Sequence, residues 1–171
     1  MKSLPLLNPE NVSEEEAAMY KVRDAARAIV IDDVRMVALL HATKYNYYKL
    51  PGGGIEEGKD KLAALKRECR EEIGCEIEVT GEVASLTEYR KQLSLNQTSY
   101  CYMAHVVGTK GQPTLETEEI EHGMETLWVS LPEARRLVRS SSLNVYEASY
   151  MVARDTALID AAMRVMDGTM H

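Results

Sequence analysis

The chain has 171 residues, of which 45% are hydrophobic and 27% charged, proportions typical of one globular domain. Its 20 basic and 27 acidic residues give a formal net charge of −7, which argues against nucleic-acid polymers as partners and favours a small molecule. No apolar run reaches 18 residues and the N-terminus lacks a signal pattern, so we expect a cytoplasmic protein with no membrane partner.

The first predicted elements are a short helix and two strands. Ser13 stands three residues before Glu16, a capping-box spacing that predicts a short helix in residues 1–22. Two strands are predicted within residues 27–42, with a tight turn at Asp32-Asp33. The tyrosines that follow are Tyr45, Tyr47 and Tyr48. They are either half-buried strand residues or a stacking surface for a base.

Residues 50–75 read LPGGGIEEGKDKLAALKRECREEIGC, a glycine-rich turn followed by a predicted helix. Asp60 is placed to cap the start of this helix, and Gly74 suits a left-handed residue just past its end. One buried face is indicated by apolar residues at spacings of three and four: Leu62, Leu65, Cys69 and Ile73.

Three carboxylates, those of Glu68, Glu71 and Glu72, share about one turn of this helix. On a solvated surface their repulsion costs only about 0.2–0.5 kcal/mol per pair, so an ordinary charged face with an Arg67–Glu71 ion pair is one interpretation. The glycine turn favours another, because glycine lets the backbone approach a ligand closely. Clustered carboxylates suit Mg²⁺ or Mn²⁺, which commonly bridge to substrate phosphates.

This stretch resembles the signature of the Nudix hydrolases, G-x5-E-x7-R-E-U-x-E-E-x-G-U, in which U is a bulky apolar residue. Gly53 opens the match, and the further matching positions are Arg67, Glu68, Cys69, Glu71, Glu72, Gly74 and Cys75. One position departs from the pattern, since Lys59 replaces the first glutamate.

The resemblance implies an α/β fold, a Nudix-type α/β/α sandwich with a mixed sheet and a long C-terminal helix. The corresponding division of the chain is an N-terminal extension (1–22), a Nudix domain (23–140) and a C-terminal helix (141–171) that packs on the domain or on a partner subunit.

The resemblance also implies a site for Mg²⁺ or Mn²⁺. Glu68 and Glu72 match the usual direct ligands, Glu71 binds directly or through water, and a carbonyl of Gly52 or Gly53 adds an oxygen. Arg67 matches the arginine that orients the glutamates. With Lys59 in place of the first glutamate, either metal binding is weakened, or Arg67 pairs with Glu71, or Glu56 or Glu57 supplies the lost carboxylate.

The chain after the signature predicts further strands and two helices. Residues 75–79 and 83–89 alternate as strands, and the second of these is expected to form a hairpin with residues 97–107. A strand at 126–130 leads into a helix with Pro132 in its first turn. A last helix runs from an Asn144 cap to about Met166, and its broad apolar stripe covers the sheet or forms a homodimer. Cys69, Cys75 and Cys101 are expected to be buried thiols.

The acidic stretch 115–125 is the expected source of a general base or an additional metal ligand. Glu118 and Glu119 are the candidates, with His122 as a substitute, against the simpler interpretation of a solvated loop. The candidate substrate contacts are Tyr48 for a base and, for phosphates, Arg23, Lys49, Lys59 and Arg90.

Together these residues predict a metal-dependent pyrophosphohydrolase acting on a nucleoside diphosphate-linked substrate, with a (deoxy)nucleoside triphosphate favoured. An ADP-sugar or other nucleotide sugar is the alternative substrate. Two other classes remain open: a catalytically weakened domain that binds a nucleotide, and an acidic interaction protein that uses its long last helix.

Overall fold

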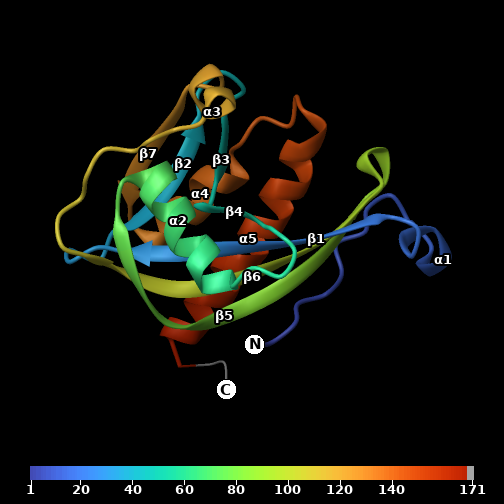
Figure 1. Cartoon of the computed structure of the whole chain (residues 1–171), viewed down its shortest axis with the longest axis horizontal. Coiled ribbons are helices and arrows are strands. Elements are labelled where there is room, and N and C mark those ends of the chain that lie inside the picture. Colours follow the sequence, from blue (N-terminus) through green and yellow to red (C-terminus); the bar gives the residue numbers. More distant parts are fainter. Residues whose placement is uncertain (169–171) are drawn as a thin grey trace.

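The computed structural model describes residues 1–168, within which seven strands form one sheet (Figure 1). The strands are β1 (Lys21–Ile31), β2 (Val37–Ala42), β3 (Tyr47–Lys49), β4 (Gly52–Ile55), β5 (Glu76–Arg90), β6 (Leu95–Val107) and β7 (Met124–Val129). The helices are α1 (Glu14–Ala17), α2 (Lys61–Ile73), α3 (Thr117–Glu121), α4 (Leu131–Arg139) and α5 (Tyr146–Met166), with a 3-10 turn η1 (Lys91–Leu93). No helix in this part of the chain has the length and apolarity to cross a bilayer.

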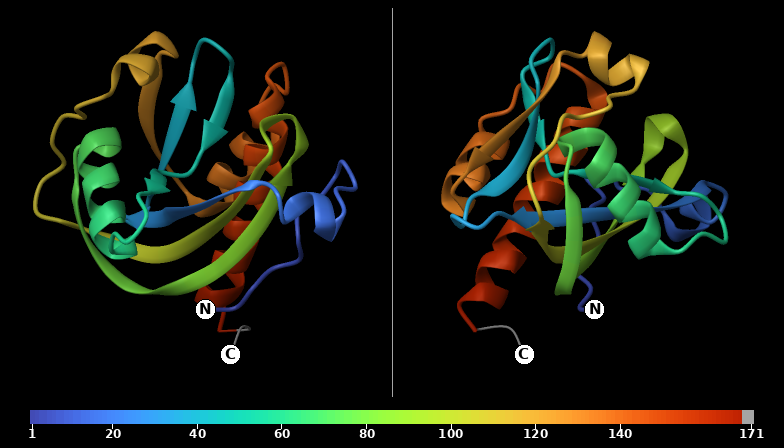
Figure 2. Two further views of the ribbon diagram at one scale, coloured as in Figure 1. Left: turned by 45° about the vertical axis from the view of Figure 1, so that its right-hand side comes forward. Right: turned by 60° about the vertical axis from the view of Figure 1, so that its left-hand side comes forward.

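The sheet is mixed and curled, with the order β3-β2-β1-β6-β5 (Figure 2). The long β1 strand pairs with β6 in parallel over its whole length, from Lys21↔Leu95 to Ile31↔His105. Its other edge is divided between β4, which is antiparallel to residues 24–27, and β2, which is paired at Ile31. Because β4 and β2 pair with different parts of this edge of β1, the two strands separate near the glycine turn that precedes β4. The candidate site lies where they separate.

Side chains of β1 alternate between two apolar cores, as expected for a strand covered on both faces. Ala28 and Val30 point to the core beneath α2, whereas Ile29 and Ile31 point to the core beneath α4 and α5. Figure 1 shows α2 in front of the sheet and α5 behind it. The predicted fold class, an α/β/α sandwich with a mixed sheet and a C-terminal helix, is confirmed.

Several helix ends lie where the local sequence places them. The Asp60 side chain accepts the Ala63 N–H at 2.8 Å, and Gly74 has φ +66°, so both predicted caps of α2 are confirmed. The Ser13 hydroxyl accepts the Glu16 N–H at the start of α1. Pro132 lies in the first turn of α4, where its missing N–H is not needed.

Three expectations about elements are wrong in detail. The final helix is not capped by Asn144, because Val145 is the N-cap residue and no side chain caps it. Leu62 does not belong to the buried face of α2, since it is 37% exposed. The stretch 115–125 is not a plain loop, because Glu116 and Glu119 form a capping box that begins the short helix α3.

The hairpin of β5 and β6 is confirmed, and the two strand segments expected around Gly81 form one strand with two register irregularities. Residues 1–20 run beside β5: the N–H groups of Leu4 and Leu7 donate to the carbonyls of Ser85 and Thr87. This segment covers the free edge of β5, which would otherwise expose unpaired backbone groups.

All three cysteines, Cys69, Cys75 and Cys101, are buried and free, as expected. Burial raises the pKa of the Cys69 and Cys101 thiols well above their usual range, so neither is a reactive thiolate at neutral pH.

Candidate active site

The glycine turn between β3 and β4 is held through the two backbone groups of Gly52. Its N–H donates to Glu72 Oε2 at 2.6 Å, and its carbonyl accepts a hydrogen bond from the buried Arg27 guanidinium. Gly52 has φ +129°, and a side chain here would overlap the carbonyl oxygen of Ala26 on β1. Only glycine therefore fits this position, and the turn is fixed against both β1 and α2.

Glu72 is the most buried carboxylate of the site, with 2% exposure. Besides the Gly52 N–H, it interacts with Lys49 Nζ, which lies 3.3 Å from its Oε1. The Thr126 hydroxyl on β7 donates to the Glu72 carbonyl. These contacts hold the negative charge of Glu72 at the inner end of the glycine turn.

Glu68 and Glu71 flank the outer side of the turn and share one arginine. Arg67 Nη2 lies 2.5 Å from Glu68 Oε1, and its Nη1 lies 2.8 Å from Glu71 Oε2. A Cβ on Gly53 would lie 2.5 Å from the Glu68 carboxyl carbon, so this glycine leaves room for the Glu68 carboxylate. Burial raises the pKa of Glu68; Arg67 opposes this effect and the Glu71 carboxylate adds to it.

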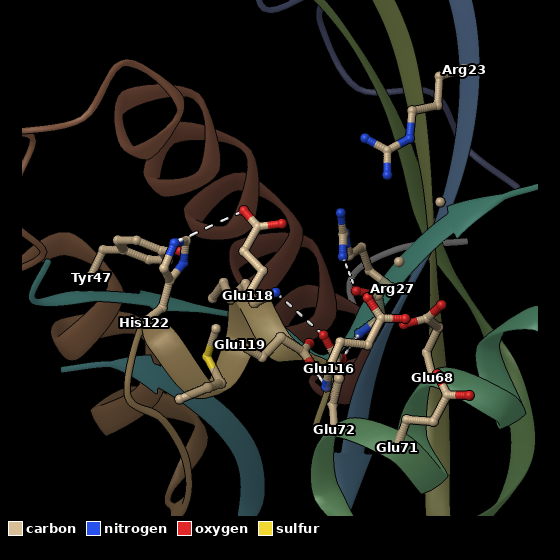
Figure 3. A pocket seen from close by; sticks show the side chains of 15 residues that line it. Arg23, Arg27, Tyr47, Glu68, Glu71, Glu72, Glu116, Glu118, Glu119 and His122 are labelled. Carbon is tan, nitrogen blue, oxygen red and sulfur yellow. Dashed lines mark hydrogen bonds and ion pairs between the residues drawn. The ribbon is translucent and has the colours of Figure 1, made fainter. Parts of the chain in front are cut away.

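These groups line a pocket of about 290 Å³ between α2, α3 and the start of β4 (Figure 3). Its acidic side chains come from two helices and their flanks: Glu68, Glu71, Glu72, Glu116, Glu118 and Glu119. Its basic side chains are Arg23, Arg27 and Lys49. Figure 3 shows Arg23 and Arg27 entering from β1, on the side where the glycine turn lies.

The α3 side of the pocket contributes the two carboxylates predicted from the acidic stretch. Glu119 accepts the Glu116 N–H at 2.8 Å. Burial raises the pKa of Glu119, and the neighbouring Glu72 carboxylate adds to the rise, while the hydrogen bond from Glu116 opposes it. Glu118 lies 3.9 Å from His122 Nε2. Helix α3 thus brings a partly buried carboxylate with a raised pKa towards Glu72.

The arginines of the pocket differ in what they do. Arg27 is 7% exposed, and burial lowers its pKa to about 10. Its guanidinium donates a hydrogen bond to the Gly52 carbonyl, so its role is to hold the glycine turn in place. Arg23 lies nearer the surface and forms no ion pair within residues 1–168. It is therefore the pocket arginine available to an anionic ligand.

The donors of the pocket fit a hard divalent cation in their chemistry. Six carboxylates converge beside backbone carbonyls, and repulsion among them helps to raise the pKa of Glu68 and Glu119, a charge imbalance that a cation would relieve. In the described residues, however, no three His, Cys, Asp or Glu side chains are arranged to hold an ion. Glu68 and Glu71 each contact Arg67 through one carboxylate oxygen, which leaves the second oxygen of each for a cation.

The structure brings together most of the site residues that the sequence suggests. Those that line the pocket are Arg23, Lys49, Gly52, Gly53, Glu68, Glu71, Glu72, Glu118, Glu119 and His122. Arg67 contacts two of these carboxylates from outside the pocket, and its pairing with Glu71 was one of the outcomes expected from Lys59.

Three candidate substrate contacts lie outside this pocket. The ring of Tyr48 stacks on His41, with 4.2 Å between centroids. Arg90 is 6% exposed and pairs with the buried Glu88 at 2.5 Å. Lys59 lies on the loop before α2 and lines the neighbouring groove.

Arg27 and Met124 line the pocket but were not singled out by sequence reasoning, which named Glu116 only as part of the acidic stretch. A signal for Arg27 exists: it interrupts the otherwise apolar run from Ala25 to Ile31, which is an unusual place for a surface cation.

Comparison with known proteins decides the family. The family model described as the NUDIX domain matches residues 21–148, three quarters of the chain. The chain belongs to the Nudix family. No curated protein matches its sequence.

Solved structures agree with the fold. A NUDIX hydrolase from Nitrosomonas europaea is 16% identical with a TM-score of 0.65, covering 85% of this chain and 90% of that one. An ADP-ribose pyrophosphatase from Streptococcus suis is 19% identical, with a TM-score of 0.54 and coverage of 83% and 92%. A C. elegans Ap4A hydrolase in a binary complex is 15% identical, with a TM-score of 0.60 and coverage of 85% and 98%.

Family membership makes the chain a pyrophosphohydrolase. Nudix hydrolases generally use divalent cations and act on small nucleotide-linked substrates. The carboxylates of the acidic pocket beside the glycine turn are of the type that binds such cations.

Proposed function

We propose that this Nudix hydrolase cleaves a pyrophosphate bond in a nucleoside diphosphate-linked substrate with the help of Mg²⁺, and that a nucleoside triphosphate is its favoured substrate. The observation that carries the proposal is the arrangement of charge in the pocket. Carboxylates of α2 and α3 face Arg23 across the glycine turn. A cation held by the carboxylates and an arginine opposite are complementary to a bridging phosphate.

Glu68, Glu71 and Glu72 would hold the cation, with the Gly53 carbonyl as a further oxygen donor. When bound, Mg²⁺ would neutralise negative charge on the phosphate oxygens and lower the pKa of the attacking water. Arg27 keeps the turn carbonyl in place by its bond to Gly52. Arg67, which contacts both outer carboxylates, orients them before the substrate arrives.

Glu119 is the proposed general base, with Glu118 as its neighbour on α3. Its carboxylate is partly buried and has a raised pKa, which brings it closer to the range in which a base works efficiently at neutral pH. Arg23 would contact a phosphate oxygen, and its guanidinium suits this role because it is planar and permanently charged.

A nucleotide sugar is the alternative substrate, in keeping with the name of the ADP-ribose pyrophosphatase among the similar structures. A catalytically weakened nucleotide-binding domain is the second candidate function. Lys59 at the first signature glutamate and the pairing of Glu68 and Glu71 with Arg67 favour it.

Glu72→Gln tests the proposal against a panel of nucleoside triphosphates, ADP-ribose and diadenosine tetraphosphate. The amide still accepts the Gly52 N–H but removes the charge. We expect Mg²⁺-dependent release of phosphate or pyrophosphate to fall roughly 10²-fold or more, because losing a metal ligand removes several kcal/mol of transition-state stabilisation. The melting temperature should change little.

The matched control is Glu121→Gln, an exposed residue of α3 that does not line the pocket. Full activity in Glu72→Gln would exclude the ligand role. Nucleotide binding without turnover in the wild type would support the weakened-domain function instead.

A further inference from the structure

A second hollow of about 710 Å³ continues from the active-site pocket along β1 and the loop before α2. We call it the lysine groove; its lining residues include Lys21, Arg23, Gly54, Lys59 and Lys61. Arg23 and Gly54 also line the active-site pocket, so the two hollows meet at these residues. A ligand that leaves the acidic pocket past Arg23 therefore enters the lysine groove.

None of the four cations in the groove has a carboxylate partner within residues 1–168. Lys21, Arg23 and Lys59 form no ion pair within residues 1–168, whereas Lys61 lies over the Tyr100 ring at 3.7 Å. This is notable in a chain with a net charge of −7, where carboxylates are plentiful. Unpaired cations that share a concave surface attract anions because their fields add.

The groove also contains Asp24, Glu56 and Glu57, so its acidic side chains are fewer than its cations. Lys21 and Arg23 lie on the same face of β1, while Asp24, the next residue, points to the other face. The two cations of β1 therefore lie on one face of the strand, and Arg23 lies where the groove meets the active-site pocket.

Gly54 explains how Arg23 reaches the junction. A Cβ at this position would lie 2.5 Å from Arg23 Nη2 and 2.7 Å from its Nε. Without a side chain at Gly54, the guanidinium lies against the turn, between the pocket and the groove. Figure 3 shows this guanidinium directed towards Arg27 and the carboxylates.

The location of Lys59 in the lysine groove indicates a role for this residue. It occupies the place of the first signature glutamate, and the structure puts it in the groove instead of the acidic pocket. A glutamate here would repel an anion leaving the active site, whereas the lysine attracts one. The departure from the family pattern therefore coincides with a cationic extension of the site.

We propose that the lysine groove binds substrate phosphates beyond the bond that is cleaved, so that the substrate carries three or more phosphates in a row. Lys21, Arg23 and Lys59 provide the contacts, and Lys59 is the residue that distinguishes such a substrate from a diphosphate-linked sugar. This inference rests on the proposed function, because it takes the acidic pocket as the place of hydrolysis.

The test uses Lys21→Gln/Lys59→Gln, which removes two charges without adding a carboxylate, and compares diadenosine tetraphosphate with ADP-ribose. We expect the KM for the tetraphosphate to rise about tenfold, as charge-assisted contacts are lost, with kcat nearly constant. The kcat/KM for ADP-ribose should stay within about twofold of wild type, since a diphosphate does not extend into the groove.

The matched control is Lys66→Gln, an exposed lysine on α2 that lines neither hollow. Equal increases in KM for both substrates would overturn the inference. So would an equal effect of Lys66→Gln, which would show that only overall charge matters.

A binding measurement without catalysis separates the two proposals. Inorganic tripolyphosphate, titrated calorimetrically in the absence of Mg²⁺, should bind the wild type and bind the double variant about tenfold more weakly. If the wild type hydrolyses no nucleotide but shows this difference, the proposed hydrolysis fails and the anion groove stands. If tripolyphosphate binds both proteins equally, the groove fails even if hydrolysis is found.

Discussion

At the scale of single residues, neighbouring glycines of the turn accommodate charged groups of opposite sign. Gly53 leaves space for the Glu68 carboxylate, and Gly54 leaves space for the Arg23 guanidinium. The two groups lie on different sides of β4 because successive residues of a strand face opposite ways. In the proposed mechanism, the turn therefore separates the carboxylate that binds the metal from the arginine that binds a phosphate.

Gly53→Ala is expected to damage activity more than stability. The added methyl group would lie 2.5 Å from the Glu68 carboxyl carbon and would push this flexible side chain away from the turn. Displacing a catalytic group by about 1 Å costs on the order of 10²-fold, so we expect a loss of that size in kcat/KM. Steady-state kinetics and thermal unfolding of the same preparation measure both effects.

Gly81→Ala is the matched control, because no atom lies within 4 Å of the Cβ it would add. Wild-type kinetics in Gly53→Ala would mean that Glu68 can leave its place without consequence, which contradicts its proposed ligand role.

At the scale of elements, α5 does more than cover the sheet. Asp155 Oδ2 accepts the Leu50 N–H at 2.9 Å, just before the glycine turn. Its other oxygen lies 2.7 Å from Arg154 Nε, and Arg154 Nη1 lies 4.0 Å from Glu88. All three side chains are at most 1% exposed. The last helix thus reaches the active-site turn through a buried chain of charges.

Asp155→Ala should destabilise the protein by roughly 3–5 kcal/mol, because it leaves the Arg154 charge and the Leu50 N–H buried without this partner. Asp155→Asn keeps an acceptor for Leu50 and removes only the charge, so its loss should be smaller. Urea unfolding of both variants measures the difference. Equal stability of Asp155→Ala and the wild type would show that the turn does not depend on this contact.

Glu10 joins the N-terminal segment to α5. Its carboxylate accepts hydrogen bonds from the hydroxyls of Tyr146 and Tyr150, at 2.6 and 2.5 Å, and from the Lys91 N–H at 3.0 Å. The bond from Tyr146, followed by that from Tyr150, lowers the pKa of Glu10 below its ordinary value of 4.5.

The stability that Glu10 contributes should depend on pH. Its folded pKa is depressed, so the contribution is fully present above pH 4.5 and is lost as the pH falls through the folded pKa. Glu10→Gln should therefore be less stable than the wild type at pH 7, and the difference should shrink below pH 4.5. Chemical unfolding at a series of pH values measures this.

Glu14→Gln is the control for this series, since it lies on the same segment without these tyrosine contacts. A difference between Glu10→Gln and the wild type that stays constant down to pH 3 would contradict the assignment.

The two helices α2 and α5 show what sequence can and cannot predict. The caps of α2 are local, since Asp60 bonds three residues ahead and Gly74 closes on its own helix, and both were predicted correctly. In α5, Arg154 and Asp155 are buried although their residue types suggest solvent exposure. Their partners, Glu88 and Leu50, are 66 and 105 residues distant, and no spacing rule connects them.

The candidate site likewise contains residues that the local sequence predicts and residues that only the fold brings in. The carboxylates of α2 follow from helical spacing alone, whereas Arg27 enters the site only through the pairing of β1 with β4. The parallel pairing of β1 with β6 is equally long-range, and its register depends on the whole sheet. The signature and the caps are readable in sequence because they are local, whereas the role of Arg27 depends on strand pairing and is not.

At the scale of the whole molecule, charge should couple cation binding to stability. The pocket brings six carboxylates together in a protein whose net charge is already −7. A ligand that binds only the folded state raises the unfolding free energy by about 2.7 kcal/mol at 100 times its Kd. For a chain of this size we expect the melting temperature to rise by roughly 5–10 °C in saturating Mg²⁺.

EDTA should reverse the rise, and Glu72→Gln should show a much smaller one, while Glu121→Gln should behave as the wild type. Calorimetric scans with and without Mg²⁺ measure this independently of turnover. An equal increase in all three proteins would indicate general screening of acidic charge and would contradict a specific site.

The bond between Glu10 and the tyrosines of α5 also bears on how the chain is completed during synthesis. Glu10 emerges from the ribosome early, but its partners follow 136 and 140 residues later. The backbone bonds from the opening segment to β5 can form earlier, but the Glu10 carboxylate obtains its tyrosine partners only when α5 is made. Chains shortened to end before Tyr146 should leave residues near Glu10 more open to proteases than residues 4–7, because only the latter keep all their bonds to β5.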